Sequence, residues 1–403
     1  MYQHGHGSII ALAMAKLNPK RAFRDDELAQ FACLAIRIGL DFDASREIGH
    51  AKQIESVESY MRIVFAVPSH LEYMRTGIPS EPVLAEAAAR LLNWGLGGNS
   101  DKHMKTLAPT VLNKAFERGF LARGERGEMI ARLLWTLAYD EVAKGGHSLN
   151  DPVVFHQPIK VLDFLRKLFH GNHWDEILNA KPMGDPDGPS LSEAFKSAYI
   201  CFSHFMDAVD HHINLRNVYR LLLRGAALSC QRNQRSIDFL TPILFGTPDS
   251  TQIRRSNTSV LQAQVKNRNQ EEEFIADPSL VQSKHPVISI IHELGSPKSE
   301  VECKSFTRPS NRHGRHYQIV ARGCSSGTYG IIPSSMDETY PMLLGSNLLM
   351  EDFPRKTIKS CASLFYQMQP CVGLYGGQKG KEGPWGKNEP KVEIQSWFGR
   401  DVE

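Results

Sequence analysis

Several signals that would place this chain in a well-known class are missing from its sequence. Its seven cysteines include no C-x-x-C pair, and the spacing of Cys303, Cys324, Cys361 and Cys371 fits no zinc-binding pattern. An odd number of scattered cysteines is typical of a reduced intracellular protein and excludes a closed disulfide framework. We therefore expect an intracellular protein, in the nucleus or the cytoplasm.

Long apolar runs and a strong net charge are also absent. No run approaches the ~20 residues that a membrane-spanning helix needs, so we expect no membrane partner. The segment SIIALAMA near the N-terminus resembles a signal cleavage site, but no Lys or Arg precedes it and KLNPKR follows, which favours a short amphipathic helix over secretion. The net charge is only +3, so any surface for a polyanion must be local.

Apolar residues recur at helical spacing through the first half of the chain, which predicts helices there. In SEPVLAEAAARLLNWGL, Ser80 is a candidate N-cap, a Pro follows and glycines end the segment. The same kind of pattern continues towards Cys230. The predicted helical segments are 25–40, 80–96, 124–146, 158–171, 191–210 and 214–230.

The period then shortens towards two, which predicts strands. The candidate strand segments are 235–245, 259–267, 285–295 and 315–324. Pro242, inside the first, suits an edge strand or a strand end. Helices followed by strands indicate an α/β protein. We expect a helical region over 1–115, a mixed-sheet core flanked by helices over 116–300, an α/β extension over 301–375 and a flexible tail over 376–403.

One ordered set of polar residues combines a predicted helix with two predicted strands. Glu128 lies near the start of the helix, Asp238 in the first strand, and Gln264 and Lys266 two residues apart in the second. Hydrolysis of a phosphodiester needs a divalent cation, and Mg²⁺ prefers oxygen ligands. Asp238 and Gln264 are then candidate ligands for Mg²⁺ or Mn²⁺. Lys266 is a candidate to stabilise the phosphate, and Glu128 to hold a metal-bound water.

This order of residues resembles the PD-(D/E)xK restriction-endonuclease-like superfamily, in its Mrr-like branch with a QxK strand. The resemblance spans about 125–293 and implies a restriction-endonuclease-like core and a metal-dependent nuclease acting on DNA. Phrases such as RGERGEMIARLLWTLAYD and ARGCSSGTYGII resemble uncharacterised basidiomycete proteins of the Crinkler and retrotransposon-hot-spot kind. Those proteins join a P-loop ATPase to a nuclease-like region, whereas this chain has no G-x-x-x-x-G-K-[ST], so ATP hydrolysis is not implied.

Other interpretations of the same residues remain open. Gln264 and Lys266 also suit the solvated face of an edge strand, Asp238 a strand end, and Glu128 an acid favoured by the helix dipole. Gln in place of a carboxylate removes one negative charge. The chain could therefore be an inactive nuclease-like module that binds nucleic acid or a protein, or a fragment of a larger effector.

Two further groups of residues are weaker candidates. His204, Asp207, Asp210, His211 and His212 cluster around the end of the predicted helix over 191–210, and His204, Asp207 and His211 would share a helical face and could hold a metal ion. Basic stretches with interleaved aromatic residues could neutralise the phosphates of a nucleic acid without reading its sequence. The basic candidates for that contact are Arg254, Arg255, Arg312 and Arg315.

Overall fold

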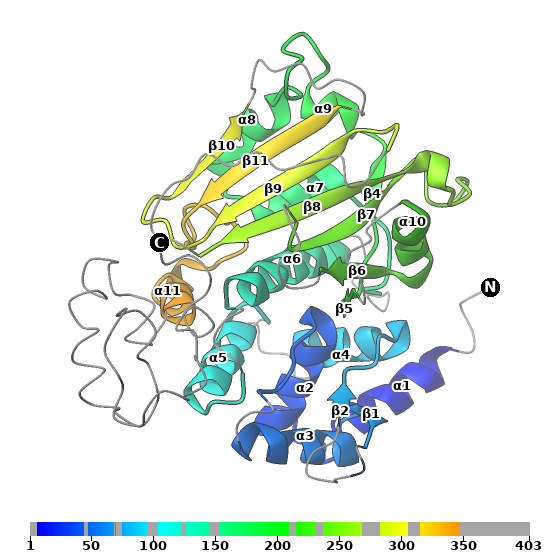
Figure 1. Cartoon of the computed structure of the whole chain (residues 1–403), viewed down its shortest axis with the longest axis vertical. Coiled ribbons are helices and arrows are strands. Elements are labelled where there is room, and N and C mark those ends of the chain that lie inside the picture. The colour runs from blue at the N-terminus through cyan, green and yellow to red at the C-terminus, as the bar shows by residue number, and fades with distance from the viewer. Residues whose placement is uncertain are drawn as a thin grey trace, which may run out of the picture. The chain divides into compact units, whose positions relative to one another are not determined.

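A mixed β-sheet forms the centre of the fold, as Figure 1 shows. In the computed structural model it has nine strands among the described residues, in the order β10-β11-β9-β8-β7-β4-β3, with β6 also paired to β7 and β5 to β6. The strands are β3 (Ile159–Lys160), β4 (Ala198–Ile200), β5 (His204–Asp207), β6 (Ala226–Ser229), β7 (Phe239–Phe245), β8 (Thr258–Lys266), β9 (Val287–Glu293), β10 (Glu300–Lys304) and β11 (His316–Arg322).

The structure describes residues 6–43, 47–67, 69, 75–94, 104–121, 126–145, 154–208, 215–230, 237–267, 283–304 and 315–345. Arg312, Asp210, His211, His212 and the predicted tail over 376–403 lie outside these residues. Contacts divide the chain into a unit over Met1–Leu344 and a second over Gly345–Glu403. Every element described here belongs to the first unit. Residue 300, where we expect the core to end, is the first residue of β10, a strand of the same sheet.

Helices cover both faces of the sheet. Those at its centre and edges are α6 (Arg126–Gly145), α7 (Val161–Leu168), α8 (Trp174–Asn179), α9 (Leu191–Ala194), α10 (Leu215–Arg224) and α11 (Thr339–Leu344). The N-terminal region contributes α1 (His6–Leu17), α2 (Glu27–Ile38), α3 (Glu47–Ser59), α4 (Pro82–Trp94), α5 (Met104–Glu117) and a small antiparallel pair, β1 (Ile63–Ala66) with β2 (Arg75–Gly77). No helix in the described part of the chain is long and apolar enough to cross a membrane. The α/β class expected from the sequence is confirmed.

Strand direction decides where the ends of the central strands meet. The three neighbours β8, β9 and β11 run parallel, so their carboxyl ends lie at one edge of the sheet. The β7 strand runs antiparallel to β8, so it begins at that same edge. The first turn of α6 also packs there, as described below. This edge therefore gathers the ends of elements that are far apart in the sequence.

Trp135 of α6 anchors the helix to the sheet. Its ring packs edge-on against Phe239 of β7, with 4.8 Å between ring centroids, and its indole N–H donates to Nε2 of His292 on β9 at 3.0 Å. His292 then carries its proton on Nδ1, which lies 2.7 Å from the hydroxyl of Tyr329. Burial lowers the pKa of His292 to about 3, so this buried imidazole is neutral at physiological pH.

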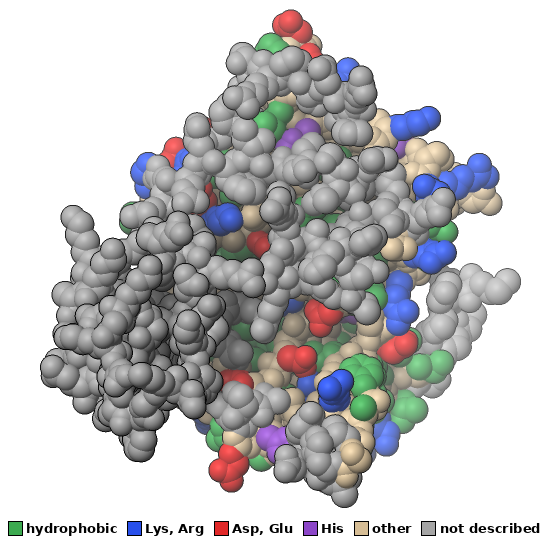
Figure 2. All heavy atoms as spheres, in the orientation of Figure 1, with side chains coloured by type: hydrophobic (Ala, Val, Ile, Leu, Met, Phe, Trp, Pro, Cys, Tyr) green, Lys and Arg blue, Asp and Glu red, His purple; other side chains and the backbone are tan. Residues whose placement is uncertain are grey.

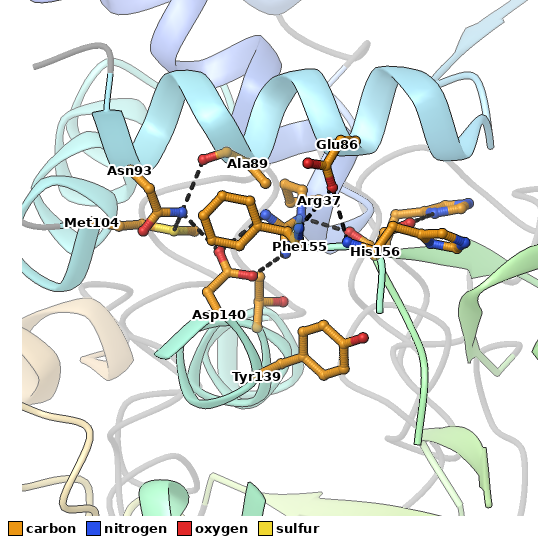
Figure 3. Close-up of polar contacts among 12 residues, drawn as sticks. Arg37, Glu86, Ala89, Asn93, Met104, Tyr139, Asp140, Phe155 and His156 are labelled. Carbon is orange, nitrogen blue, oxygen red and sulfur yellow. Dashed lines mark hydrogen bonds and ion pairs between the residues drawn. The ribbon is translucent and has the colours of Figure 1, made fainter. Parts of the chain in front are cut away.

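A buried ion pair joins the N-terminal helices to the same helix α6 (Figure 3). The guanidinium of Arg37 on α2 donates to both carboxylate oxygens of Asp140 on α6, at 2.6 and 3.1 Å, and its Nε donates to the carbonyl of Ser203 at 2.6 Å. Asn93 of α4 donates to Asp140 at 3.0 Å. Both charged side chains are almost completely buried. Bidentate geometry and the added hydrogen bonds offset the cost of removing these charges from water.

Two of the predicted helices are wrong in part. The segment 191–210 contains only the short α9, followed by β4 and β5, because the run AYICFSHFM is almost continuously apolar and aromatic and suits buried strands. The segment 214–230 begins as α10 but turns at Gly225, whose φ is +59°, into β6. A Cβ at Gly225 would also lie 1.8 Å from the His156 ring, so only glycine fits this turn.

Pro242 lies inside the sheet, and the prediction of an edge strand or strand end for it is wrong. On one side β7 pairs with β8 along its length. On the other side β4 pairs with Ile243–Phe245 and β6 with Phe239 and Leu240. Pro242 therefore lies between the segments of β7 that pair with β6 and with β4. No described neighbouring strand needs a backbone N–H donor from residue 242 on that side.

The Arg37–Asp140 pair yields a stability prediction. We expect Arg37→Met to lower the free energy of unfolding by about 3–5 kcal/mol, because it leaves the buried carboxylate of Asp140 without its cation. Denaturant unfolding measures this loss. Lys52→Met, which breaks the half-exposed Lys52–Glu55 pair on α3, is the matched control and costs less than about 1 kcal/mol. Equal losses in the two variants would contradict the role of the buried pair.

Candidate functional site

The first turn of α6 lies directly against the end of β8. A Cβ placed on Gly127 would stand 3.2 Å from both Val265 Cγ1 and Asn267 Cβ, closer than nearly all real Cβ contacts. Asn267 in turn donates to the carbonyl of Leu344 at 3.2 Å, which ties this end of β8 to the end of α11. Glycine at 127 therefore brings the start of the helix, with Glu128, to the end of the strand that holds Gln264 and Lys266.

Asp238 is held at the same strand end by two hydrogen bonds. It lies immediately before β7 rather than within it, and its N–H donates to the carbonyl of Ala263 at 2.9 Å. Its carboxylate Oδ2 accepts from the N–H of Val265 at 2.6 Å. Because Val265 is the residue between Gln264 and Lys266, the carboxylate lies beside the centre of the Q-x-K motif.

The surroundings of Asp238 shift its pKa in opposite directions. Burial has the largest effect and raises the pKa of the carboxyl above its usual value of 3.8. The Val265 N–H bond lowers it, and so do the positive charges of Lys266 and Arg132. The net shift is upward. A carboxylate in this environment is short of positive charge, so a bound cation would stabilise its ionised form.

Gln264 has a buried side-chain oxygen with no hydrogen-bond partner among the described residues. The residue is 7% exposed, and its Oε1 accepts no hydrogen bond from them. An orphaned buried carbonyl oxygen costs about 1–3 kcal/mol, so a ligand at this oxygen would stabilise the fold. Lys266, two residues on, projects from the same face of β8 and is half-buried. The expected pairing of these two side chains on one strand face is therefore present.

Glu128 is linked to Asp238 through a residue that the sequence did not single out, Cys230. The N–H of Cys230, at the end of β6, donates to the carbonyl of Asp238 at 2.7 Å, so the two residues are paired neighbours. Burial, together with the negative charges of Asp238 and Glu128, raises the pKa of the Cys230 thiol to about 12. Both carboxylates thus lie within electrostatic range of one thiol. The only sequence signal for Cys230 was its position after an apolar run.

A charged row continues across the sheet from Lys266. In the parallel register Lys266 is paired with Glu293 of β9, and Glu293 with Arg322 of β11. Arg322 donates to Glu293 and to Glu302 at 2.9 Å each, and Glu300 lies 3.5 Å away. The sequence did not predict this row. The alternation of side chains along one strand does not show which residues of distant strands are paired.

The basic candidates lie at the other end of the sheet. Arg254 precedes β8 and Arg255 begins a 3₁₀ turn, η3 (Arg255–Asn257). Arg315 directly precedes β11 and lies 3.7 Å from Asp185. Because β8 separates Thr258 from Lys266 by eight steps of ~3.3 Å, Arg254 and Arg255 are about 26 Å or more from Lys266. The structure therefore separates these arginines from the Q-x-K motif.

The alternative metal site on the predicted 191–210 helix loses its basis. His204 and Asp207 lie on strand β5, where the helical spacing between them does not apply. His204 is buried, with Nε2 2.8 Å from the Ser80 hydroxyl and Nδ1 3.0 Å from the Ser203 hydroxyl. Ser80, the candidate N-cap of α4, is thus engaged with this histidine. Across the described ranges, no three His, Cys, Asp or Glu side chains lie close enough to hold a metal ion.

Comparison with known proteins gives a family and no activity. The model of a family described as a domain of unknown function (DUF8736) matches residues 22–286, which is more than half of the chain. The chain belongs to this family. No curated protein and no solved structure matches it. The matched range includes Glu128, Asp238, Gln264 and Lys266, so all four candidate residues lie within the family's domain.

The raised pKa of Asp238 yields a prediction with a definite sign. A carboxyl whose pKa is raised on folding stabilises the protein fully below about 3.8, and that contribution is lost as the pH rises through the raised value. Asp238→Asn removes this loss and keeps an oxygen that accepts from Val265. We therefore expect its Tm relative to the native chain to increase over that pH window and to remain no lower at neutral pH.

Thermal unfolding of the two proteins across this pH range measures the effect. Asp249→Asn, at an exposed carboxylate in the β7–β8 turn, is the control and should show no such change. A Tm of Asp238→Asn well below that of the native chain at neutral pH would mean that the ionised carboxylate stabilises the fold.

Proposed function

We propose that this member of the DUF8736 family is a divalent-metal-dependent nuclease that hydrolyses phosphodiester bonds in DNA. The observation that carries the proposal is the hydrogen bond from the Val265 N–H to the Asp238 carboxylate. It places a carboxylate beside the residue that separates Gln264 from Lys266. An acid, an amide oxygen and an ammonium then converge on one strand end, as in a PD-(D/E)xK-like site. We also propose, from the free thiols of the described cysteines, that the protein acts inside the cell.

The residues at this strand end fit a Mg²⁺ or Mn²⁺ ion. Asp238 offers a carboxylate whose second oxygen is not used by the Val265 bond, and Gln264 offers the orphaned Oε1. Two protein oxygens leave several positions for water, which suits Mg²⁺ because it dehydrates reluctantly. When bound, such an ion neutralises charge on the phosphate and lowers the pKa of a bound water. Glu128 is a candidate to accept a proton from that water.

Lys266 would act on the phosphate itself. Its ammonium projects from the same face of β8 as Gln264, and its charge acts on Asp238, so a phosphate bridging the two residues would lie beside it. Negative charge on the phosphate oxygens increases as the nucleophile attacks. A fixed cation at that position binds the transition state more tightly than the ground state. Lys266 is therefore the residue on which the rate should depend most strongly.

The second candidate function is a nuclease-like module without catalysis, which binds nucleic acid or a protein. One specific observation favours it. Gln264 is neutral, Glu293 beside Lys266 is paired with Arg322, and Glu128 lies one helix away, so among the described residues Asp238 is left as the carboxylate offered to a cation at the Q-x-K motif. A single negative charge holds a divalent cation weakly. The two candidates differ in whether phosphodiester bonds are broken, which a cleavage assay decides.

Plasmid nicking tests the catalytic proposal. We expect the native chain to convert supercoiled DNA to nicked circles with Mg²⁺ or Mn²⁺ and not with EDTA. Lys266→Ala should slow this conversion by at least about 100-fold, because it removes a donor that stabilises the transition state. Lys167→Ala, at an exposed lysine on α7, should cleave at the native rate. Cleavage by Lys266→Ala at the native rate would overturn the assignment.

The orphaned oxygen of Gln264 allows a test that needs no turnover. We expect Gln264→Glu to have a lower Tm than the native chain in EDTA, since it buries a second negative charge beside Asp238. Added Mn²⁺ or Mg²⁺ should restore its Tm and should raise it more than that of the native chain, because a cation now has two carboxylates.

Gln262→Glu is the matched control for this experiment. Gln262 lies on the same strand and the same face, is 1% exposed, and donates to the Ser289 hydroxyl at 2.8 Å. Its replacement should destabilise the fold to a similar degree, and metal should not restore its Tm. Equal recovery of both variants, or of neither, would show that Asp238 and Gln264 do not form a cation site.

A further inference from the structure

Helix α10 presents arginines to solvent. Its sequence LRNVYRLLLR contains three arginines and no acidic residue. Val218, Leu221 and Leu222 are buried against the sheet, whereas Arg220 and Arg224 are exposed. These two arginines are four residues apart and therefore lie on one face of the helix. Leu223, 65% exposed, lies between them. The outward side of α10 thus combines positive charge with an apolar contact.

Two loops next to α10 add further cations. The turn η3, which α10 contacts, carries Arg255, with Arg254 directly before it, and both side chains are exposed. Lys284 is exposed in the segment before β9. The ring of His285 holds the two loops together, because its Nε2 lies 2.9 Å from the Ser256 carbonyl. That ring also stacks on Phe245 at a centroid distance of 4.4 Å.

The balance of charge on these segments differs from that of the chain. The whole sequence has 47 basic and 44 acidic residues. By contrast, the basic surface consists of Arg220, Arg224, Arg254, Arg255 and Lys284. The nearby described acids are Asp249 in the β7–β8 turn and Glu81, which lies 3.7 Å from Arg224. Figure 2 shows Lys and Arg side chains gathered along this side of the molecule, over the β7–β8 turn and α10.

We propose that the basic surface binds the phosphate backbone of duplex DNA. The inference rests on the proposed function for its choice of partner, and it adds α10 and Lys284 to the arginines expected from the sequence. Exposed arginine and lysine side chains spread over a helix and two loops bind phosphates without reading sequence. The surface is a binding site and takes no part in the chemistry.

The position of the surface sets the length of the substrate. It adjoins the beginning of β8, whereas Lys266 ends that strand, about 26 Å away. A duplex rises ~3.4 Å per base pair, so one that contacts both places must span about 8 base pairs. A shorter duplex would contact one of the two places at a time. The surface therefore selects long nucleic acids over dinucleotides and small phosphodiesters.

Fluorescence anisotropy with a labelled duplex of about 24 base pairs tests the proposal. The titrations use the full chain in EDTA at several salt concentrations, so that binding is measured without cleavage. We expect Arg254→Ala/Arg255→Ala and Arg220→Ala/Lys284→Ala each to reduce the slope of log K against log salt by about 2. Lys114→Ala/Arg118→Ala removes one cation of α5 and one directly after it, 48% and 51% exposed, and should leave the slope unchanged.

Each result bears on one proposal at a time. Unchanged slopes in both surface variants, with native unfolding curves, would overturn the basic surface. Binding of a polyglutamate peptide to the native chain as tightly as the duplex, and its loss in both surface variants, would overturn nucleic acid as its partner. If the native chain binds through this surface but nicks no plasmid, the basic surface stands and the nuclease proposal fails.

Discussion

The buried ion pair between Arg37 and Asp140 is the interaction on which the rest of the structure depends. It lies where α2, α4 and α6 meet the residue before β5, so one charge pair fixes four segments. Such a pair gives no advantage over apolar packing in free energy, but it tolerates only one geometry, because either charge alone would be buried without a partner. The pair also fixes the position of α6. Asp140 holds the helix near its C-terminal end and Trp135 holds its middle, so its first turn can move little relative to the sheet. The N-terminal helices therefore help to position Glu128, which lies in that first turn.

The edge where β8, β9 and β11 end combines closely packed backbone with a buried polar atom that lacks a hydrogen bond. Gly127 allows α6 to approach Val265 closely, and the N–H of Val265 fixes the Asp238 carboxylate. These contacts leave the Gln264 oxygen buried without a partner, although most buried polar atoms in a fold are satisfied. Other buried polar atoms of the described residues also lack a hydrogen-bond partner, the Oε1 of Gln262 among them, and that of Gln264 is distinguished by the Q-x-K motif whose central N–H holds the Asp238 carboxylate. Ligands of open α/β sheets also bind outside the carboxyl ends of parallel strands.

The sequence predicted the central strands of the sheet better than it predicted the segments around them or the pairing between strands. Runs of β-branched and aromatic residues, with alternation in SVLQAQVKN, predicted β7, β8, β9 and β11. The helix expected over 191–210 failed, since a buried strand and a buried helix are both continuously apolar over ten residues. For the site, the Q-x-K spacing placed Gln264 and Lys266 on one strand face correctly. The bond from Val265 to Asp238, the pairing of Cys230 with Asp238 and the row through Glu293 to Arg322 depend on register between strands, which no local pattern encodes.

The neutral side chain at position 264 affects both folding in the absence of metal and the affinity of this strand end for a cation. A glutamate there would stand beside a carboxyl whose pKa burial already raises, so the two would repel each other in the absence of metal. Glutamine avoids this repulsion and costs only an unsatisfied carbonyl, which lets the strand end fold before any cation binds. The same choice weakens the hold on a divalent cation, since one negative charge is lost. Under the proposed function, a polyanionic substrate would compensate, because its phosphate oxygens would add negative ligands when it binds. The metal would then bind tightly only together with a nucleic acid, which makes anchoring of that nucleic acid elsewhere on the protein the step that assembles the site.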